Sequence, residues 1–367
     1  MTAGDADLVR GPGSGDGVDV VVVGAGISGL VAADAAHRAG RRVVVLEARD
    51  RVGGRLRSRS VAGGAVDLGA TWFWGNEPGV WTLVERLGVG AFRQYATGDA
   101  MFEPGPRRLA GAPGVGEAAR FARGAQDLAT RLAAQLPPDT IRLGTRVTSV
   151  EIDDDKVRVD STGGPITAGH VVLALPPPLV AEGIRIEPAL PGPLRELAAR
   201  TQVWMGEMIK AVAVYPEPFW RAQGLSGFAM SHQGPFREIH DHSGPDGTPA
   251  ALFGFAPSAA FAGIDEPGVA EAFTAQLTRL FGHDAARPSW TEVVDWSRDP
   301  HTMPARPHPR RSTAGYGAAE FSEPVHGRVH WASTETAEGF AGHIEGGVLA
   351  GLRAAEAVVR AVPTGRA

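Results

Sequence analysis

The sequence predicts an α/β fold, and three features of the residue pattern indicate it. Residues 18–47 contain two buried strands joined by a helix, the unit from which parallel sheets are built. Alternating apolar and polar residues at 146–161 predict a hairpin, and further strands and helices follow as far as residue 362. A length of 367 residues is enough for about two domains.

The composition is that of an ordinary globular protein and excludes several kinds of site. Apolar residues make up 43% and charged residues 21%, which allows a sizeable core. The net charge of −5 gives no basic surface for nucleic acid. With 0 cysteines, the chain has no disulfides, no iron–sulfur cluster, no thiolate metal site and no cysteinyl link to a cofactor.

The two ends of the chain and its apolar runs predict the compartment of the protein and whether it binds a membrane. Residues 1–17 are rich in Gly and Asp, and they predict a disordered leader without a signal sequence. The apolar run at 18–23 is far shorter than the roughly 20 residues of a membrane helix. We also expect no tail anchor, because residues 363–367 form no apolar segment. We therefore expect a cytoplasmic protein that binds no membrane, and the sequence leaves an oligomer possible.

The first half of the chain alternates between strands and helices. A strand at 18–23 ends at Gly24, a helix runs from Ile27 to Ala39, and a second strand spans 43–46. The pattern then predicts, in order, a Gly/Arg loop at 51–59, a hairpin at 61–68, helices at 80–87 and 117–136, the hairpin at 146–161 and a strand at 171–175.

The second half is predicted to be a sheet with covering helices. Its expected elements are strands at 205–214, 236–240 and 251–255, a helix at 268–281, a strand at 328–332 and a helix at 344–362.

A glycine-rich turn joins the first strand to the first helix. Gly24-Ala25-Gly26-Ile27-Ser28-Gly29 fits the pattern G-x-G-x-x-G in the strand-to-helix context that the motif requires. We expect Gly24, Gly26, Ser28 and Gly29 to hold a pyrophosphate at the start of the helix. Glu47 ends the second strand, where an acid binds a ribose hydroxyl. The unit therefore predicts a dinucleotide site.

Two further segments resemble those of the flavin amine oxidases, the monoamine oxidase-like group. They are Glu47-Ala48-Arg49-Asp50-Arg51-Val52-Gly53-Gly54-Arg55 and Asp67-Leu68-Gly69-Ala70-Thr71-Trp72. The resemblance implies a Rossmann-type lobe that binds FAD, interleaved with a mixed-sheet substrate lobe. The helical region of the substrate lobe, between about 91 and 117, is shortened in this chain. By resemblance, FAD contacts are also expected at Ala48, Arg49, Gly54, Arg55, Gly69, Ala70, Thr71, Trp72, Val147 and Trp296.

A lysine interrupts the apolar strand Met208-Ile209-Lys210-Ala211-Val212-Ala213-Val214-Tyr215. Lys156 and Lys210 are the lysines of this chain, which otherwise uses Arg. A buried ammonium costs several kcal/mol unless it is paired or its pKa falls. The segment is similar to the family strand whose lysine holds a water against flavin N5, so we expect Lys210 to be catalytic. A strand-edge lysine that reaches solvent is the alternative.

The C-terminal region resembles the second FAD block of the family. It comprises Gly327–Ala337 and Phe340–Val348, followed by a helix. The resemblance places Ser333, Thr334, Glu335, Gly342, His343 and Ile344 at the cofactor. A helix N-terminus at the flavin would stabilise the anionic reduced ring.

Ser312-Thr313-Ala314-Gly315-Tyr316 resembles the segment where some relatives attach the flavin through cysteine. Gly315 occupies that position, so noncovalent FAD is expected. Tyr316 matches one wall of the family's aromatic cage, and His343 aligns with the opposite wall. An imidazole can stack, but it also donates a hydrogen bond and titrates near pH 6.5. We expect Tyr316 and His343 to be catalytic, with a structural helix-start role as the alternative for His343.

Three further residues are weaker candidates for a functional role. His240 and His242 share a strand face, but the following Gly244-Pro245 favours an exposed turn, so no metal is expected. Glu238 is interpreted as a surface strand acid, with a position facing the substrate cavity as the alternative.

The sequence therefore predicts an FAD-dependent oxidase. Residues 18–77, 137–192 and 312–362 are assigned to the FAD lobe, and 78–136 and 193–311 to the substrate lobe. The reaction expected from the resemblance is hydride transfer from the carbon next to an amine nitrogen to flavin N5, which gives an imine and, with O2, hydrogen peroxide. The alternatives are a desaturase, amide oxidase or oxidative cyclase acting on a bulky metabolite, and a flavin-binding scaffold or redox sensor.

Overall fold

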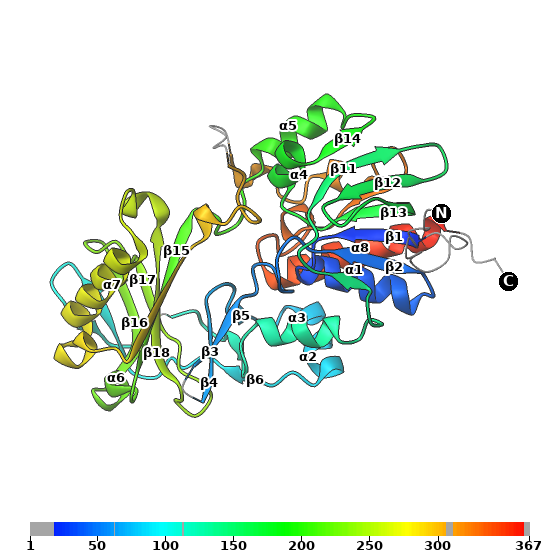
Figure 1. The fold of residues 1–367 in the computed structure, drawn as a ribbon. Helices are drawn as coiled ribbons and strands as arrows, with labels where there is room; N and C mark the ends of the chain where they lie inside the picture. The colour runs from blue at the N-terminus through cyan, green and yellow to red at the C-terminus, as the bar shows by residue number, and fades with distance from the viewer. Residues whose placement is uncertain (1–17, 62, 112–113, 306–310, 363–367) are drawn as a thin grey trace, which may run out of the picture.

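The computed structural model describes residues 18–61, 63–111, 114–305 and 311–362. The expected leader at 1–17 and the tail at 363–367 lie outside the described residues. Two lobes, each built on a sheet, lie side by side (Figure 1). The strands are β1 Val18–Val23, β2 Val43–Leu46, β3 Ser58–Val61, β4 Gly64–Asp67, β5 Trp72–Phe73, β6 Ala91–Arg93, β7 Asp99–Glu103, β8 Arg107–Leu109, β9 Ala119–Phe121, β10 Ile141–Arg142, β11 Val147–Ile152, β12 Val157–Ser161, β13 Ile166–Leu173, β14 Arg185–Glu187, β15 Met208–Tyr215, β16 Leu225–Ser231, β17 Glu238–Asp241, β18 Ala250–Pro257, β19 Trp290–Asp295 and β20 Val329–Trp331. The α-helices are α1 Ile27–Arg38, α2 Pro78–Leu87, α3 Gln126–Ala133, α4 Pro177–Gly183, α5 Gly192–Arg200, α6 Phe219–Ala222, α7 Glu266–Phe281 and α8 Ile344–Ala361.

The first lobe is built on a sheet with the order β10-β2-β1-β13-β12-β11-β14, and β20 pairs with β13 beside this path. Its centre is parallel: β1 pairs with β2 on one side and with β13 on the other. Both faces of β1 are covered, so its valines from Val20 to Val23 are all buried. A continuous run of β-branched residues is the pattern expected of such a strand. The predicted α/β lobe with buried parallel strands is confirmed.

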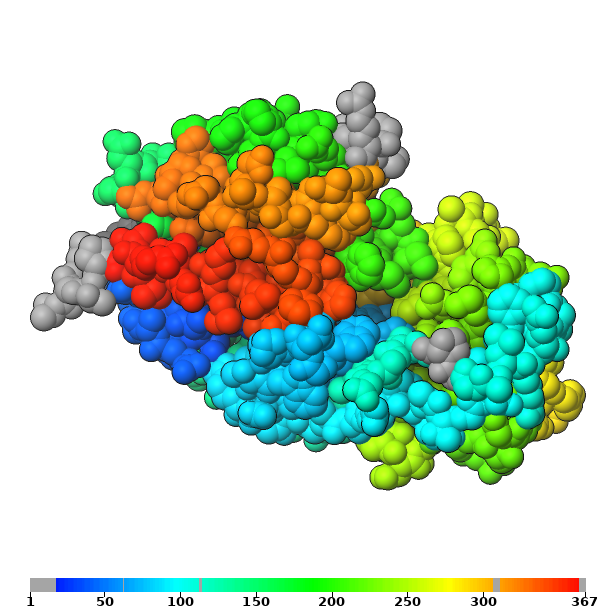
Figure 2. Space-filling view, turned by 180° about the vertical axis from the view of Figure 1, so that it is seen from behind, coloured from blue at the N-terminus to red at the C-terminus, as the bar shows by residue number. Residues whose placement is uncertain are grey.

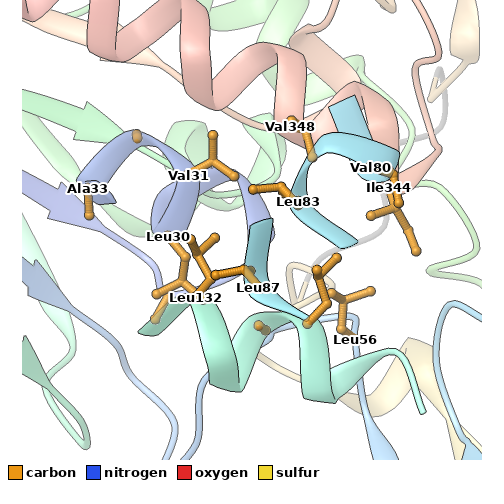
Figure 3. Packing of buried hydrophobic residues seen from close by; sticks show 14 of the residues in the cluster. Leu30, Val31, Ala33, Leu56, Val80, Leu83, Leu87, Leu132, Ile344 and Val348 are labelled. Atoms are coloured by element: carbon orange, nitrogen blue, oxygen red, sulfur yellow. The ribbon is translucent and has the colours of Figure 1, made fainter. Parts of the chain in front are cut away.

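Four helices share one apolar core on a face of this sheet. Leu30 and Val31 of α1, Leu83 of α2, Leu132 of α3 and Val348 of α8 belong to the same buried cluster. Their side chains point toward one another (Figure 3). Helices α2 and α3 therefore pack with the nucleotide-type sheet, whereas the sequence assigned residues 78–136 to the substrate lobe. The reason is that the apolar stripes of α2 and α3 face α1 and α8.

The first and last helices of this lobe are in close contact. A Cβ atom at Gly351 would lie 2.4 Å from Ser28 O, and one at Gly347 would lie 2.7 Å from Ile27 Cγ2. Glycine at both positions lets the α8 backbone approach the start of α1. Seen from behind, α8 also lies against the segment that contains α2 (Figure 2).

The second lobe is built on a sheet with the order β19-β15-β18-β17-β16-β7-β8. Helix α7 packs on one face, where Phe273 and Leu277 join the apolar residues of the sheet. On the other face, Val212 and Val214 pack with Leu68, which follows β4. Because side chains alternate along a strand, Lys210 shares this inner face with Val212 and Val214.

Three predicted elements differ in the structure, and one of them is the strand expected at 171–175, which is part of the longer β13, Ile166–Leu173. The helix expected at 117–136 is strand β9 followed by the shorter helix α3, because residues 119–121 pair with β5 and β6. The strand expected to begin at 205 begins at Met208, after a turn in which Met205 has φ 57°. Within the described parts of the chain, none of the helices combines the length and the apolarity needed to cross a bilayer.

Candidate active site

The glycine turn and Glu47 form one end of the site. Gly24 has φ 102°, and a Cβ at Gly29 would lie 2.0 Å from Gly24 O, so the tight turn and the helix packing both require glycine. Gly26 has nothing within 4 Å of such an atom and faces open space. Glu47 is 3% exposed and accepts the N–H of Ala25 at 2.7 Å and of Arg49 at 2.9 Å. The turn at Gly24–Gly29 is therefore bound to a buried carboxylate and leaves open space at Gly26.

A cavity of about 500 Å³ begins at this turn and reaches the second sheet. Most residues that the sequence predicted at the cofactor line it: Gly24, Gly26, Ser28, Glu47, Arg49, Gly54, Arg55, Gly69, Ala70, Thr71, Trp72, Trp296, Ser333, Thr334, Gly342, His343 and Ile344. Lys210 lines it as well. Segments far apart in the sequence thus meet around one space.

Five predicted residues do not line the cavity. Gly29 and Ala48 lie next to residues that do, and Val147 is buried in the sheet core. Glu335 does not line the cavity but forms an ion pair with Arg55, which does. Tyr316 donates its hydroxyl to Gln202 O at 2.8 Å, and its roles as a cage wall and catalytic group stay predictions. Burial raises the pKa of Tyr316.

Arg55 and Glu335 form an ion pair across the two FAD-type segments. Arg55 Nη1 lies 2.6 Å from Glu335 Oε1, and the Glu335 side chain is 0% exposed. Burial alone would raise the pKa of Glu335, but the Arg55 guanidinium outweighs it, so this pKa is below its usual value. The same carboxylate accepts the N–H of Trp204 at 3.2 Å. The pair therefore ties the turn before β15 to both segments.

Lys210 reaches the cavity from β15 and is 1% exposed. Its Nζ donates to Gly69 O at 2.9 Å and to Thr71 Oγ1 at 2.5 Å, and lies 4.1 Å from the centre of the Phe253 ring. Burial lowers the pKa of Lys210 to about 7, although the charge of Asp67 opposes that shift. The ammonium is thus poised to titrate near neutral pH.

Asp67 and Arg120 lie behind Lys210, and sequence reasoning gave neither a role. Asp67 is 0% exposed, and burial raises its pKa. Arg120 donates to the backbone oxygens of His242 and Ser243. Arg120 lies in the segment 117–136, whose helix-forming residues predict a helix rather than a buried strand.

His240 and His242 were predicted to lie in an exposed turn, but His240 belongs to strand β17 and both side chains are buried in aromatic surroundings. Nε2 of His242 accepts the N–H of Asp67 at 2.7 Å, and the His240 ring stacks on Phe253. Burial lowers the pKa of both histidines. In the part of the chain that the structure describes, no cluster of three His, Cys, Asp or Glu has metal-binding geometry.

Several cavity residues were not predicted to act. Trp74, Trp204, Met205, Met208, Arg237, Glu238 and Phe255 line the cavity. Trp204 is 42% exposed and lies over Gly342, where a Cβ atom would be 2.8 Å from its ring. Glu238 was interpreted as a surface acid; it is exposed and also lines the cavity.

The residues present fit a large polar ligand such as FAD. Gly26 leaves room at the helix start, and Ser333 Oγ is buried without a hydrogen-bond partner. A buried unsatisfied hydroxyl costs free energy unless a ligand completes it. The walls combine backbone N–H groups and charged side chains with indole and aliphatic surface, as a flavin nucleotide requires.

Comparisons with known proteins agree with this architecture. A family model described as Flavin containing amine oxidoreductase matches residues 106–359, and one described as NAD(P)-binding Rossmann-like domain matches residues 22–87. The chain belongs to the flavin-containing amine oxidoreductase family. It is an FAD-dependent oxidoreductase of the amine oxidase type, as the sequence predicted.

Individual relatives are distant but cover nearly the whole chain. The putative flavin-containing monoamine oxidase AofH of Mycobacterium tuberculosis is 29% identical over 446 aligned positions, covering 93% of this chain and 96% of that protein. Putrescine oxidase of Kocuria rosea is 25% identical, covering 94% and 95%. The structure of cyclohexylamine oxidase from Brevibacterium oxydans IH-35A matches with a TM-score of 0.84 and 26% identity, covering 94% of this chain and 99% of that one.

These relatives contain segments that this chain lacks, because an alignment of 446 positions exceeds its 367 residues. The described residues between 91 and 121 form four short strands, β6 to β9, and no helix. This agrees with the shortened helical region that the sequence predicted.

Proposed function

We propose that this protein binds FAD noncovalently and oxidises an amine at the carbon next to nitrogen, with O2 as electron acceptor. When bound, the flavin supplies the redox chemistry, because it accepts a hydride and passes the electrons to O2. The observation that carries the proposal is Lys210, an ammonium buried at the cavity wall and held by Gly69 O and Thr71 Oγ1. The cytoplasm stays the predicted compartment, and an oligomer stays possible.

Different residues around the cavity would bind the cofactor, orient the substrate and supply a proton. The turn at Gly24–Gly26 and the start of α1 would hold the pyrophosphate, and Glu47 the ribose. Trp72, Trp74 and Trp204 offer apolar walls that orient a substrate and exclude water. In its protonated form, Lys210 Nζ would supply a proton and a positive charge where negative charge develops in the reaction with O2.

Noncovalent binding is supported by Gly315. A Cβ at this position would meet Leu197 Cδ1 at 3.0 Å and Thr201 Oγ1 at 3.2 Å. A side chain there would point into α5. Gly315 thus has neither the chemistry nor the direction for a link to the cofactor.

The first test is an absorbance spectrum of the purified protein before and after acid precipitation. We expect the two visible bands of oxidised flavin, with the yellow colour released into the supernatant. Colour retained in the pellet would mean a covalent link, and a colourless protein that FAD does not reconstitute would contradict the proposal.

A panel of amines then separates the oxidase from the alternative reactions. We expect hydrogen peroxide together with ammonia or aldehyde. Peroxide without either product would favour a desaturase, an amide oxidase or an oxidative cyclase. The short connection at 91–121 favours that second candidate, because fewer residues are available to enclose a small amine.

A further inference from the structure

A buried carboxylate supports the imidazole at the cavity wall. Glu77 Oε1 lies 2.6 Å from His343 Nδ1, and Glu77 Oε2 accepts the backbone N–H of Trp74 at 3.1 Å. The Glu77 side chain is 1% exposed, whereas the His343 side chain is 38% exposed and lines the cavity. Among the described residues, His343 is the ionic partner of Glu77. The imidazole thus links a buried negative charge to the space where a substrate enters.

This arrangement fixes which ring nitrogen of His343 carries hydrogen. An ionised carboxylate only accepts hydrogen bonds, so both Glu77 oxygens require donors. Trp74 N–H supplies one donor, and His343 Nδ1–H must be the other. The neutral ring then has Nε2 as an acceptor, and no hydrogen bond to the described residues occupies that atom. His343 therefore offers a lone pair that a substrate can use.

We propose that His343 Nε2 accepts a proton from a protonated amine substrate and that Glu77 is the positioning residue for this transfer. The inference rests on the proposed function. An N–H bond of the ammonium breaks, its electron pair stays on nitrogen, and the proton forms a new N–H bond at Nε2. The resulting imidazolium is stabilised by the Glu77 charge, and the neutral amine keeps the lone pair that oxidation next to nitrogen requires.

The other charged groups around the site have different partners. Arg55 is paired with Glu335, Glu238 lies 3.4 Å from His240, and Lys210 donates to Gly69 and Thr71. Glu47, Arg49 and Arg237 also line the cavity.

A second buried carboxylate nearby accepts hydrogen bonds from backbone N–H groups instead of from a histidine. Glu345, two residues after His343, directs its oxygens to the N–H groups of Gly79 and Val80 at the start of α2. Glu77 is thus the carboxylate whose contact orients the ring.

The tautomer of His343 tests the positioning role without turnover. In FAD-loaded protein labelled with 15N-histidine, NMR is expected to show the Nδ1–H form of the neutral ring, with H343F assigning the signals. In E77Q the amide has one oxygen for two donors, so the Nε2–H form is expected to appear. E345Q is the matched control and is expected to leave the tautomer unchanged. A wild-type ring in the Nε2–H form, or a ring unmoved in E77Q, would overturn the positioning role.

The proton transfer is tested by anaerobic reduction of the bound flavin with benzylamine as a function of pH. E77Q is expected to slow reduction at neutral pH by about tenfold or more, since general bases contribute about 10²–10⁴-fold. It is also expected to displace the rising limb of the pH profile toward the pKa of the amine itself. In the H343F background the same E77Q substitution is expected to have no further effect on the rate.

Equal effects of E77Q in the wild-type and H343F backgrounds would overturn the proton-transfer role. If no amine of the panel reduces the wild-type protein, the proposed function fails together with proton acceptance. The tautomer spectra then still decide whether Glu77 orients the ring, so the two failures are distinguishable.

Discussion

Replacing Lys210 with methionine is expected to slow turnover with an amine and O2 by about 10²–10³-fold, the usual effect of removing one preorganised charge or donor from a site. Methionine keeps the length and the apolar stem but removes Nζ, whose contacts are Gly69 O and Thr71 Oγ1. Stopped-flow measurement of the reductive and oxidative half-reactions checks this. If both stay at the wild-type rate, the role assigned to Lys210 is wrong.

The same substitution is expected to stabilise the folded protein at pH 7. The pKa of Lys210 falls from an ordinary 10.5 to about 7 in the folded state, so the folded state disfavours the charge. Between these values the unfolded chain binds the extra proton, so stability rises with pH across this window and the full penalty applies below it. Allowing for the lost hydrogen bonds, we expect a gain of about 1–3 kcal/mol.

The measurement is chemical denaturation of the FAD-loaded protein at pH 7 and at pH 10. The advantage of K210M over wild type is expected to shrink at the higher pH, because there the wild-type amine is neutral in the folded state. Lys156 is the matched control, since it is the other lysine of the chain and is exposed. K156M is expected to change neither rate nor stability, and a K210M protein less stable than wild type at pH 7 would contradict the prediction.

The second large effect is expected from replacing Glu335 with glutamine. Glu335 is 0% exposed and pairs with Arg55 at 2.6 Å, so the change leaves a guanidinium without its counter-charge. Breaking a buried pair in this way costs about 3–5 kcal/mol. The side chain of Arg55 is 26% exposed, which places the expected loss at the lower end, about 3 kcal/mol. Because Arg55 lines the cavity, FAD affinity is expected to fall about tenfold.

The pH dependence of this effect has a definite sign. Arg55 lowers the pKa of Glu335 below its ordinary value of 4.5 despite burial. The pair therefore contributes its full stability above that value and loses it as the pH falls through the lower folded-state pKa. Thermal unfolding from pH 7 to pH 3 is expected to show the difference between wild type and E335Q narrowing in acid.

The control for this variant is E187Q. Glu187 pairs with Arg185 at 3.0 Å, but both side chains are more than half exposed. Such surface pairs contribute about 0–1 kcal/mol, so a small change is expected. An E335Q protein as stable as E187Q at pH 7 would show that the buried pair has no such effect.

The sequence predicted the elements whose pattern is set by burial alone. Strands β1 and β2, helix α1 and helix α8 were expected within a few residues of their bounds, because valine runs and apolar stripes are local signals. Arg55, Lys210 and His343 were identified because each lies in a motif with a chemical reason for its residue type. They all line the cavity.

The remaining features depend on contacts that no local pattern encodes. Residues 119–121 look helical, but pairing with β5 and β6 makes them a strand. Glu77 precedes Pro78, and no motif around it predicts burial. Its partner His343 is 266 residues away in the sequence. Tyr316 was expected in the cavity, but its hydroxyl is bound to Gln202 O.

The close contact between α1 and α8 has a consequence for how this protein matures during synthesis. The turn at Gly24–Gly29 leaves the ribosome early, yet Ser28 and Val31 receive their partners at Gly347 and Gly351 only after α8 has been made. Until then the apolar side of α1 lacks its neighbour α8, and the cavity lacks the wall formed by Ser333, Gly342 and Ile344. A nascent chain stalled before α8 would therefore expose this side of α1 and would need protection from aggregation.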